Sequence, residues 1–292
     1  MKVLSLKLTL IVFLYSSPAW GQDIDDLLNE TIAGETEYVY ATFKSTRIVS
    51  GHSIERMPAK QLDFRISHRF GRVNGGIYEF WGLDQASIRM GLEWGITDWL
   101  MVGAGRGNYE KTFDGFLKFS LLRQSKGAKN MPVSLSYLAT SAVNTFRWEG
   151  ESDLPFMNRV SYVHQLLVAR KFGERLSLEI NPGFVHRNMV PAEADPNDLW
   201  ALGLGGRFKI TKRVSLNAEY YYVYPDDNEY LGNPTYHPLS VGFDIETGGH
   251  VFQIHLTNSE AMIEKAFIGE TTGNWLDGDI HVGFNISRVF TL

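Results

Sequence analysis

The sequence predicts an all-β fold: a closed antiparallel transmembrane β-barrel of about 12 strands, with short periplasmic turns and longer outer loops. Three observations lead to this prediction. Apolar residues alternate with small or polar residues in one segment after another, and the connections between these segments alternate between short and long. After residue 21, no apolar run reaches the length of a transmembrane helix, which is about 20 residues.

The first 21 residues have the composition of a secretion signal. Lys2 precedes an apolar run over residues 8–14, and small residues stand at Ala19 and Gly21, where a signal peptidase would cut. The apolar run is too short to cross a bilayer as a helix. We therefore expect residues 1–21 to be a signal peptide that is removed on export.

The chain is acidic and contains no cysteine. Its formal net charge is −5, and loss of the two lysines in the signal makes the mature chain more negative. This charge argues against nucleic acid as a partner. The absence of cysteine excludes disulfides, thiolate metal sites and a lipid anchor on an N-terminal cysteine. We expect no cofactor and no bound metal.

Residues 60–292 are expected to form the barrel as one unit, because no Pro/Ser-rich linker or run of charges divides them. Residues 22–59 carry weaker signals. The stretch 38–49 is rich in β-forming residues, but both of its faces are mixed. One interpretation of residues 22–59 is a periplasmic tail or a first strand, and the other is a segment that folds into the lumen as a plug.

The end of the chain, residues 280–292, shows the alternation most clearly. Apolar residues occupy every second position from Ile280 to Ile286, with polar or small residues between them. Successive side chains of a strand point to opposite faces, so this strand has one face suited to lipid and one suited to a wet lumen. The other predicted strands are 61–70, 87–96, 100–105, 113–121, 133–139, 159–171, 176–184, 200–210, 214–224, 239–246 and 252–257. Residues 159–171 are apolar on both faces, so their orientation is not predicted.

The predicted strands leave two classes of connection. The short class is 97–99, 124–131, 172–175, 211–213 and 247–249, and the long class is 71–86, 141–158, 188–198, 225–238 and 258–278. The connection near 107–111 is short although it falls on the long side, and 124–131 is long although it falls on the short side. This asymmetry, with aromatic residues near both strand ends, is typical of an outer-membrane barrel. The alternative is a soluble β-sandwich, which does not need long loops at one end only.

Several short motifs resemble a known family. They are HRFGRVNGG (68–76), GLDQA (82–86), GLEWGITD (91–98), ETGGH (246–250), TTGNW (271–275) and GDIHVGFNISRVF (278–290). The chain resembles a family of uncharacterised outer-membrane β-barrel proteins of Bacteroidota over nearly all of residues 38–292. The resemblance implies a barrel in the outer membrane and carries no catalytic or binding residues with it.

The inward face of the predicted strands carries charges of both signs. The expected lumen charge network consists of Asp63, Arg65, Arg69, Arg89, Glu93, Glu179, Glu219, Asp244 and Asp279. In a closed barrel, strand 61–70 lies beside both 87–96 and 279–291, so Arg65, Arg89, Glu93 and Asp279 are expected to meet. The network either closes a narrow lumen as a structural ladder of ion pairs or selects a small solute by charge.

A weaker polar or metal candidate lies on two neighbouring strands near the end of the chain. It consists of His255, Thr257, His281 and Asn285, all predicted to face the lumen. A hydrolase needs a nucleophile hydrogen-bonded to a base, and histidines also bind metals. Polar lining of the lumen explains the same four residues. In the last long loop, residues 259–268 have helical spacing and predict a helix that either covers the mouth or packs among the loops.

These patterns predict an outer-membrane channel or transporter for small solutes or ions, and no enzymatic activity is expected. Two alternatives stay open: a barrel with a filled lumen that acts as a structural or assembly partner, and a membrane-embedded hydrolase. The expected partners are outer-membrane lipid, the barrel-assembly machinery through the C-terminal strand, and a protein of the periplasm.

Overall fold

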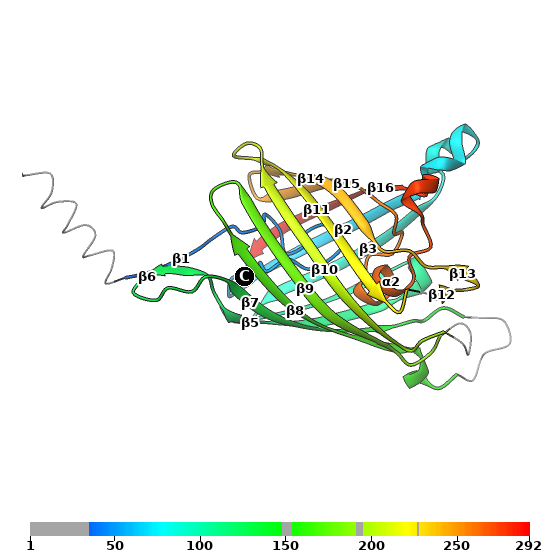
Figure 1. Cartoon of the computed structure of the whole chain (residues 1–292), viewed down its shortest axis with the longest axis horizontal. Helices are drawn as coiled ribbons and strands as arrows, with labels where there is room; N and C mark the ends of the chain where they lie inside the picture. Colours follow the sequence, from blue (N-terminus) through cyan, green and yellow to red (C-terminus); the bar gives the residue numbers. More distant parts are fainter. Residues whose placement is uncertain (1–34, 148–153, 191–194, 227) are drawn as a thin grey trace, which may run out of the picture.

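The computed structural model describes residues 35–147, 154–190, 195–226 and 228–292. Within these residues, twelve antiparallel strands close into a barrel (Figure 1). They are β2 (Gln61–Arg72), β3 (Ala86–Gly95), β4 (Leu100–Gly107), β5 (Phe113–Leu122), β7 (Ser134–Val143), β8 (Val160–Lys171), β9 (Leu176–Arg187), β10 (Asp198–Lys209), β11 (Val214–Tyr224), β14 (Leu239–Thr247), β15 (His250–Thr257) and β16 (His281–Thr291). Strand β16 pairs with β2 and closes the sheet. The predicted fold class is confirmed, and the predicted signal peptide lies outside the described residues.

The two faces of the strands follow the predicted alternation. In β3, Met90 and Leu92 are 50% and 49% exposed, whereas Arg89 and Glu93 are 3% and 0% exposed. The apolar side chains point outward, where lipid would cover them, and the charged ones point into the lumen. A closed sheet also pairs the backbone groups of every strand, which a bilayer requires because it offers no hydrogen bonds.

Strand β8 shows why its orientation did not follow from the sequence. Val163 and Leu167 are 1% and 0% exposed and face the lumen, while Leu166 is 43% exposed and faces outward. The lumen face of β8 also carries Gln165, but most of it is apolar because it packs against chain segments that fill the barrel. A strand that is covered on both faces loses its alternation.

The two ends of the barrel differ in the length of their connections, as predicted. At the long-loop end lie η1 (Val73–Gly82), η2 (Tyr109–Lys111), η3 (Phe156–Arg159), the pair β12 (Glu229–Tyr230) and β13 (Asn233–Pro234), α2 (Glu264–Gly269) and η4 (Trp275–Asp277). At the short-turn end, β1 (Thr36–Tyr38) pairs with β6 (Ser125–Gly127) outside the barrel. In the described part of the chain, no helix is long and apolar enough to cross a membrane.

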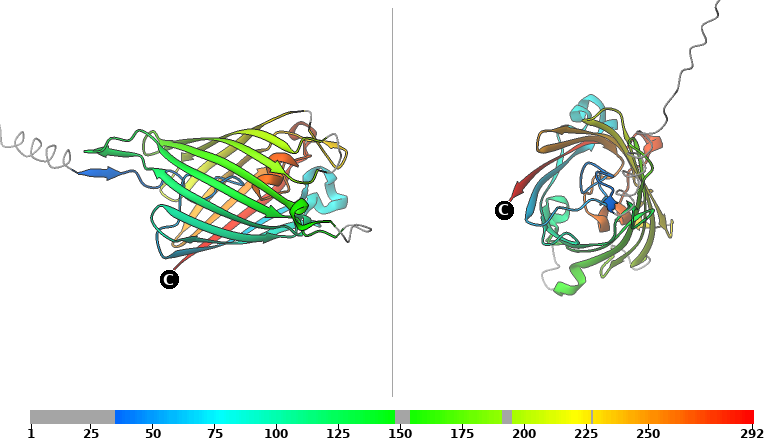
Figure 2. Two further views of the ribbon diagram at one scale, coloured as in Figure 1. Left: turned by 90° about the horizontal axis from the view of Figure 1, so that it is seen from below. Right: turned by 90° about the vertical axis from the view of Figure 1, so that its left-hand side faces the viewer.

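Residues 42–57, named here the N-terminal insert, lie inside the barrel. The chain enters the lumen from the short-turn end after β1 and returns to that end before β2, so the insert lies within the ring of strands (Figure 2). All residues from Ser45 to Ile54 are buried. The insert is a hairpin in which the Ile48 N–H donates to the Gly51 carbonyl at 2.9 Å. Of the β-forming stretch 38–49, only Tyr38 belongs to a paired strand.

Residues 259–271, named here the α2 insert, enter the lumen from the long-loop end. All residues from Ala261 to Thr271 are buried, and α2 packs against β8, β9 and β11. The helix predicted over residues 259–268 is shorter, at 264–269, and it lies inside the barrel instead of among the outer loops. The two inserts therefore fill the lumen from opposite ends (Figure 2).

The lumen wall carries two apolar patches, one under each insert. Phe43, Ile48 and Ile54 of the N-terminal insert belong to one buried cluster with wall residues such as Phe116 and Leu138. The α2 insert belongs to a second, and its buried members are Ala142, Val163, Val185, Leu199, Ala201, Tyr221, Val223, Ala261, Ile263, Ala266, Phe267 and Ile268. The expectation of a polar inward face is therefore wrong at these patches, because insert side chains take the place of water there.

Candidate functional site

The tip of the N-terminal insert is bound by Glu219 on β11. The backbone N–H groups of Val49, Ser50 and Gly51 donate to its carboxylate at 3.1, 2.7 and 3.1 Å. A Cβ atom on residue 51 would overlap the hydroxyl of Tyr221, so only glycine lets the tip approach the wall this closely. Hydrogen bonds to an ionised acceptor are roughly twice as strong as neutral ones. Glu219, expected as a lumen charge, is thus the main anchor of the hairpin tip.

Other charged wall residues also bind the main chain of the insert. The Glu179 carboxylate accepts a hydrogen bond of 2.7 Å from the Ile54 N–H. The Lys118 ammonium donates to the carbonyl oxygens of Ser53 at 2.9 Å and Glu55 at 2.8 Å. Backbone recognition of this kind depends on the path of the hairpin more than on its side chains.

Amide side chains on β15 and β16 bind the same hairpin. Asn285 on β16 donates to the Val49 carbonyl at 2.9 Å, and Gln253 on β15 donates to the Ile48 carbonyl at 3.0 Å. Gln253 also donates to the Asp244 carboxylate at 2.9 Å. Asp244 therefore acts on the insert through Gln253, and Asn285 belongs to the binding surface of the insert.

Ion pairs surround the middle of the insert. Arg65 on β2 lies 2.9 Å from Asp63 and 3.8 Å from Glu93, measured between nitrogen and oxygen atoms. Glu93 also lies 3.4 Å from Arg47 of the N-terminal insert and accepts a hydrogen bond from Thr46. The predicted neighbours Arg65 and Glu93 thus meet, and the insert supplies further partners.

The two inserts meet through a buried ion pair. The Arg47 Nη1 atom lies 2.8 Å from the Glu264 Oε1 atom of the α2 insert, and both side chains are 5% exposed. His52 of the N-terminal insert lies 3.6 Å from the same carboxylate oxygen. This contact joins a segment that enters from the short-turn end to one that enters from the long-loop end.

The other predicted charges do not form one network. Arg69 donates to Asn285 at 3.2 Å, and Arg89 donates to Asp114 on β5 at 2.8 Å. Asp279 lies outside the lumen strands, 3.2 Å from Arg72 at the long-loop end. The expectation that Asp279 meets Arg65, Arg89 and Glu93 is wrong, because β16 begins only at His281 and Asp279 belongs to the preceding loop.

The His255 and Thr257 pair does not form a catalytic arrangement. The Thr257 hydroxyl bonds to the Ser240 hydroxyl at 3.0 Å, and both ring nitrogens of His255 are buried with no hydrogen-bond partner in the described structure. The Nδ1 atom of His281 forms a hydrogen bond of 2.7 Å with the carbonyl oxygen of Phe70. Among the described residues, no three or more His, Cys, Asp or Glu side chains are placed to hold a metal ion. The geometry therefore gives no support to the hydrolase or metal interpretation of these residues.

Arg47 and Glu264 were not among the predicted site residues. Arg47 lies in a stretch without regular alternation, so its direction could not be assigned. Glu264 lies in the mostly apolar segment Ala261–Ile268, and the apolar composition of this loop was a signal that it is buried. Neither residue could be paired with the other from sequence, because 217 positions separate them.

Comparisons with known proteins agree with this architecture. The sequence matches the family model described as "Membrane bound beta barrel domain (DUF5777)" over residues 43–290. An outer membrane channel from Pseudomonas putida F1 superposes with a TM-score of 0.50 at 13% identity, covering 81% of this chain and 98% of that chain. The NanC porin gives a TM-score of 0.49 at 8% identity, covering 79% and 99%.

A third similar structure is the outer membrane phospholipase dimer from Salmonella typhi. Its TM-score is 0.43 at 12% identity, covering 86% of this chain and 98% of that chain. At 13% identity, the Pseudomonas putida channel shows a shared barrel fold and nothing more specific. No protein among the curated sequences matches this chain.

Proposed function

This chain belongs to the family of membrane-bound β-barrel domains, DUF5777, and we propose that it is a gated channel for small solutes or ions in an outer membrane. One observation carries the proposal. Charged side chains of the lumen wall bind the main chain of a hairpin that takes no part in the barrel sheet. If the hairpin leaves, Glu219, Glu179 and Lys118 become the polar lining of an aqueous path.

The cost of buried charge supports a second, hydrated state of the lumen. Removing charges from water costs several kcal/mol per ion, and well-packed apolar residues are often as stabilising as a buried ion pair. A permanently filled barrel therefore gains little from the Arg47, Glu93 and Glu264 cluster or from Glu219. Such residues suit a lumen that is closed in one state and hydrated in another.

The connections of the N-terminal insert favour displacement through one end. The hairpin enters and leaves the lumen at the short-turn end. The barrel strands pair with each other all round, so the hairpin could withdraw without breaking any strand pair of the barrel. In the outer membrane this end would face the periplasm, where a partner protein could pull on the chain before β2. The barrel-assembly machinery, through β16, and outer-membrane lipid are the other partners of this proposal.

A filled structural barrel is the second candidate, and the apolar patches favour it. Each insert buries several apolar side chains against the wall, and burial of this kind stabilises the closed state at about 25 cal/mol per Å². In that case the long loops and the segment before the insert would serve as docking surfaces. Conductance separates the two candidates.

The test is single-channel conductance in planar bilayers of four refolded chains. They are the unchanged mature chain, a chain without residues 42–57, a chain with residues 260–270 replaced by a Gly-Ser linker, and a chain with both changes. We expect the unchanged chain to stay closed and the doubly changed chain to conduct steadily. In that open chain, Glu219→Gln should lower the preference for cations.

The matched control replaces residues 74–83 with the same linker. This loop carries Ile77 and Tyr78, which are 79% and 91% exposed, and it lies outside the lumen. The control chain should stay closed like the unchanged one. If all chains fold as barrels and the doubly changed chain is silent, the channel proposal fails and the filled barrel is favoured.

A further inference from the structure

Two neighbouring connections at the short-turn end of the barrel are strongly basic. They are residues 170–175, between β8 and β9, and residues 209–213, between β10 and β11, and together they are named here the basic corner. Strands β9 and β10 pair with each other, and the Lys209 N–H donates to the Arg175 carbonyl at 2.8 Å, so the two connections are in contact (Figure 1). The charged residues of the basic corner are Arg170, Lys171, Glu174, Arg175, Lys209, Lys212 and Arg213.

The basic corner is opposite in sign to the chain as a whole. The whole chain has a formal net charge of −5. The loops at the other end of β9, β10 and β11, residues 188–197 and 225–238, contain five acidic residues and no lysine or arginine. Charges of either sign keep a loop soluble, and soluble surfaces usually mix the two signs. The concentration of positive charge at one end therefore indicates an anionic partner there.

The positive charges of the basic corner are not neutralised by the protein. Among the residues that the structure describes, none of its six basic side chains forms an ion pair with a carboxylate. The adjacent turn carries Glu246, but that carboxylate pairs with Lys44. Lys171 donates to the carbonyl of Tyr40 at 2.8 Å. The exposed basic residues, whose charged groups an anion can reach, are Arg170, Arg175, Lys212 and Arg213.

An exposed apolar surface adjoins the basic corner. It consists of Phe172, Leu176, Phe208 and Ile210. Leu176 and Phe208 are register partners on β9 and β10, so they lie beside each other. The Arg170 guanidinium lies over the Phe172 ring, 5.0 Å from its centroid, and marks the boundary between the apolar and the basic surface. A ligand that fits both surfaces has an apolar part and an anionic headgroup.

We propose that the basic corner binds an anionic phospholipid, such as phosphatidylglycerol, in the inner leaflet of the outer membrane. Short turns of outer-membrane barrels face the periplasm, which places the basic corner at that leaflet. The acyl chains lie against Phe172 and Ile210, and the phosphodiester oxygens accept hydrogen bonds from Arg175 and Arg213, because a guanidinium matches two phosphate oxygens. The proposal rests on the outer-membrane setting proposed above and not on conductance.

The test is native mass spectrometry of the refolded mature chain in a non-ionic detergent. The probes are equal amounts of phosphatidylglycerol and zwitterionic phosphatidylethanolamine that carry the same acyl chains. The unchanged chain should retain phosphatidylglycerol at least about fivefold more often, since each basic residue near an anionic lipid raises the affinity by about that factor. A variant that combines Arg175→Gln, Lys212→Gln and Arg213→Gln should lose this preference.

The matched control combines Lys60→Gln, Lys126→Gln and Lys129→Gln, three exposed residues at the same end of the barrel. It removes the same charge but leaves the basic corner unchanged, so it should keep the preference for phosphatidylglycerol. Heat-dependent mobility in gels verifies that each variant is a folded barrel. Equal retention of the two lipids by the unchanged folded chain overturns the proposal, and so does an equal loss of preference in the two triple variants.

Glycerophosphoglycerol, the same headgroup without acyl chains, separates a lipid site from a site for free phosphate esters. A lipid site also uses the apolar surface, so an equimolar amount of the free headgroup should leave phosphatidylglycerol bound to the unchanged chain. Displacement of the lipid by the free headgroup would overturn the proposal. The assay reads lipid binding in detergent, so its failure and a failure of the conductance test are separate outcomes.

Discussion

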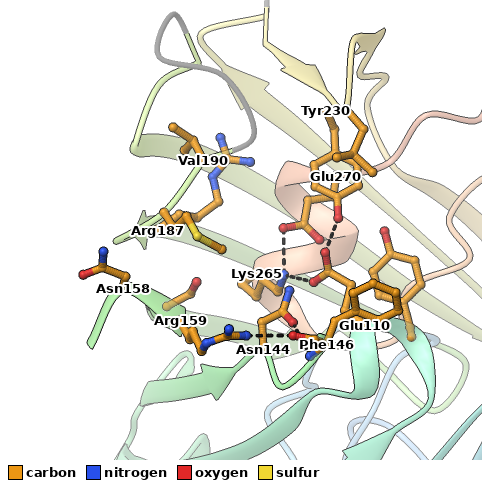
Figure 3. Close-up of a pocket in the computed structure, with 14 residues that line it drawn as sticks. Glu110, Asn144, Phe146, Asn158, Arg159, Arg187, Val190, Tyr230, Lys265 and Glu270 are labelled. Carbon is orange, nitrogen blue, oxygen red and sulfur yellow. Dashed lines mark hydrogen bonds and ion pairs between the residues drawn. The ribbon is translucent and has the colours of Figure 1, made fainter. Parts of the chain in front are cut away.

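At the scale of single residues, Glu270 is a buried carboxyl in a connecting loop that titrates near neutral pH. Burial raises the pKa of Glu270 to about 7, the ammonium of Lys265 opposes this rise, and the carboxylate of Glu110 adds to it. The charged and titratable groups around it are Lys265, Glu110, Arg187, Tyr109 and Tyr230. Protonation of Glu270 neutralises one partner of its ion pair with Lys265 (Figure 3). The net charge of the α2 insert therefore changes as the pH passes through about 7.

The stability of the barrel should therefore depend on pH through Glu270. Its pKa in the folded chain lies above the ordinary value of 4.5, so the folded state holds the proton more tightly than the unfolded state. This contribution to stability is fully present below pH 4.5 and is lost as the pH rises through about 7. The measurement is the melting temperature in detergent. The amount by which the unchanged chain exceeds Glu270→Gln should shrink as the pH rises through this window.

Glu260→Gln is the control, since it removes an exposed carboxyl from the same loop. Its melting temperature should follow that of the unchanged chain at every pH. Parallel pH profiles for Glu270→Gln and the unchanged chain would contradict the assignment.

The direction of single side chains could be predicted, but their partners could not. Alternation along β11 and β3 correctly directed Glu219 and Glu93 into the lumen, because a period of two fixes the face of every residue in a strand. Their partners lie in the N-terminal insert, whose path has no period. Asp279 was misplaced because alternation was extended beyond the first residue of β16.

At the scale of elements, the fit between the N-terminal insert and the wall depends on a glycine pair in β10. Gly205 faces the lumen, and a Cβ atom there would overlap the terminal methyl group of Ile48. Gly206 faces outward, and a Cβ atom there would make an ordinary contact of 3.5 Å with Leu178. Gly205 thus leaves room for the side chain of Ile48, and the adjacent Gly206 provides a matched control.

Gly205→Ala should loosen the N-terminal insert while leaving the barrel closed. Overpacking a filled site costs about 1–3 kcal/mol, and Ile48 must move away from β10 to relieve it. Hydrogen exchange measured by mass spectrometry should show faster exchange of peptides within residues 42–57 and unchanged exchange of the barrel strands. Gly206→Ala should leave both unchanged. Equal protection of the insert in the two variants would mean that Ile48 does not rest on Gly205.

The sequence predicts the strands of the barrel more completely than the two inserts. The strands were found because each must present one apolar face to lipid, a constraint that repeats every two residues. The inserts are not exposed to lipid, so their sequences have no such constraint. The N-terminal hairpin is held by main-chain hydrogen bonds to the wall, which leave almost no trace in its side chains. The α2 insert was visible only as a helical spacing and an apolar composition in a loop.

At the scale of the whole molecule, the lumen is filled by two segments that enter from opposite ends and meet at the Arg47–Glu264 ion pair. Sequence could predict the barrel and its two unlike ends, but not this meeting, because Arg47 and Glu264 are brought together only by closure of the sheet between β16 and β2. The pair is a direct charge contact between the inserts. It therefore offers a route by which an event at one end of the barrel changes the other.

This arrangement predicts reciprocal coupling between the inserts. Glu264→Gln should speed hydrogen exchange in residues 42–57, and Arg47→Met should speed it in residues 261–271, since breaking a buried ion pair costs about 3–5 kcal/mol. Coupling between two sites acts equally in both directions, so each substitution should speed hydrogen exchange in the other insert. The double variant should be less destabilised than the sum of the single ones, by roughly 0.5–3 kcal/mol.

The ion pair between Lys44 and Glu246 provides the control for this coupling. It also involves the N-terminal insert, but the Glu246 side chain is 43% exposed and the α2 insert takes no part in the pair. Glu246→Gln should cost only about 0–1 kcal/mol and leave exchange of the α2 insert unchanged. If Glu264→Gln leaves residues 42–57 as protected as before, the two inserts close the lumen independently. A gate would then have to open each end by itself, instead of transmitting release of one insert to the other through Arg47.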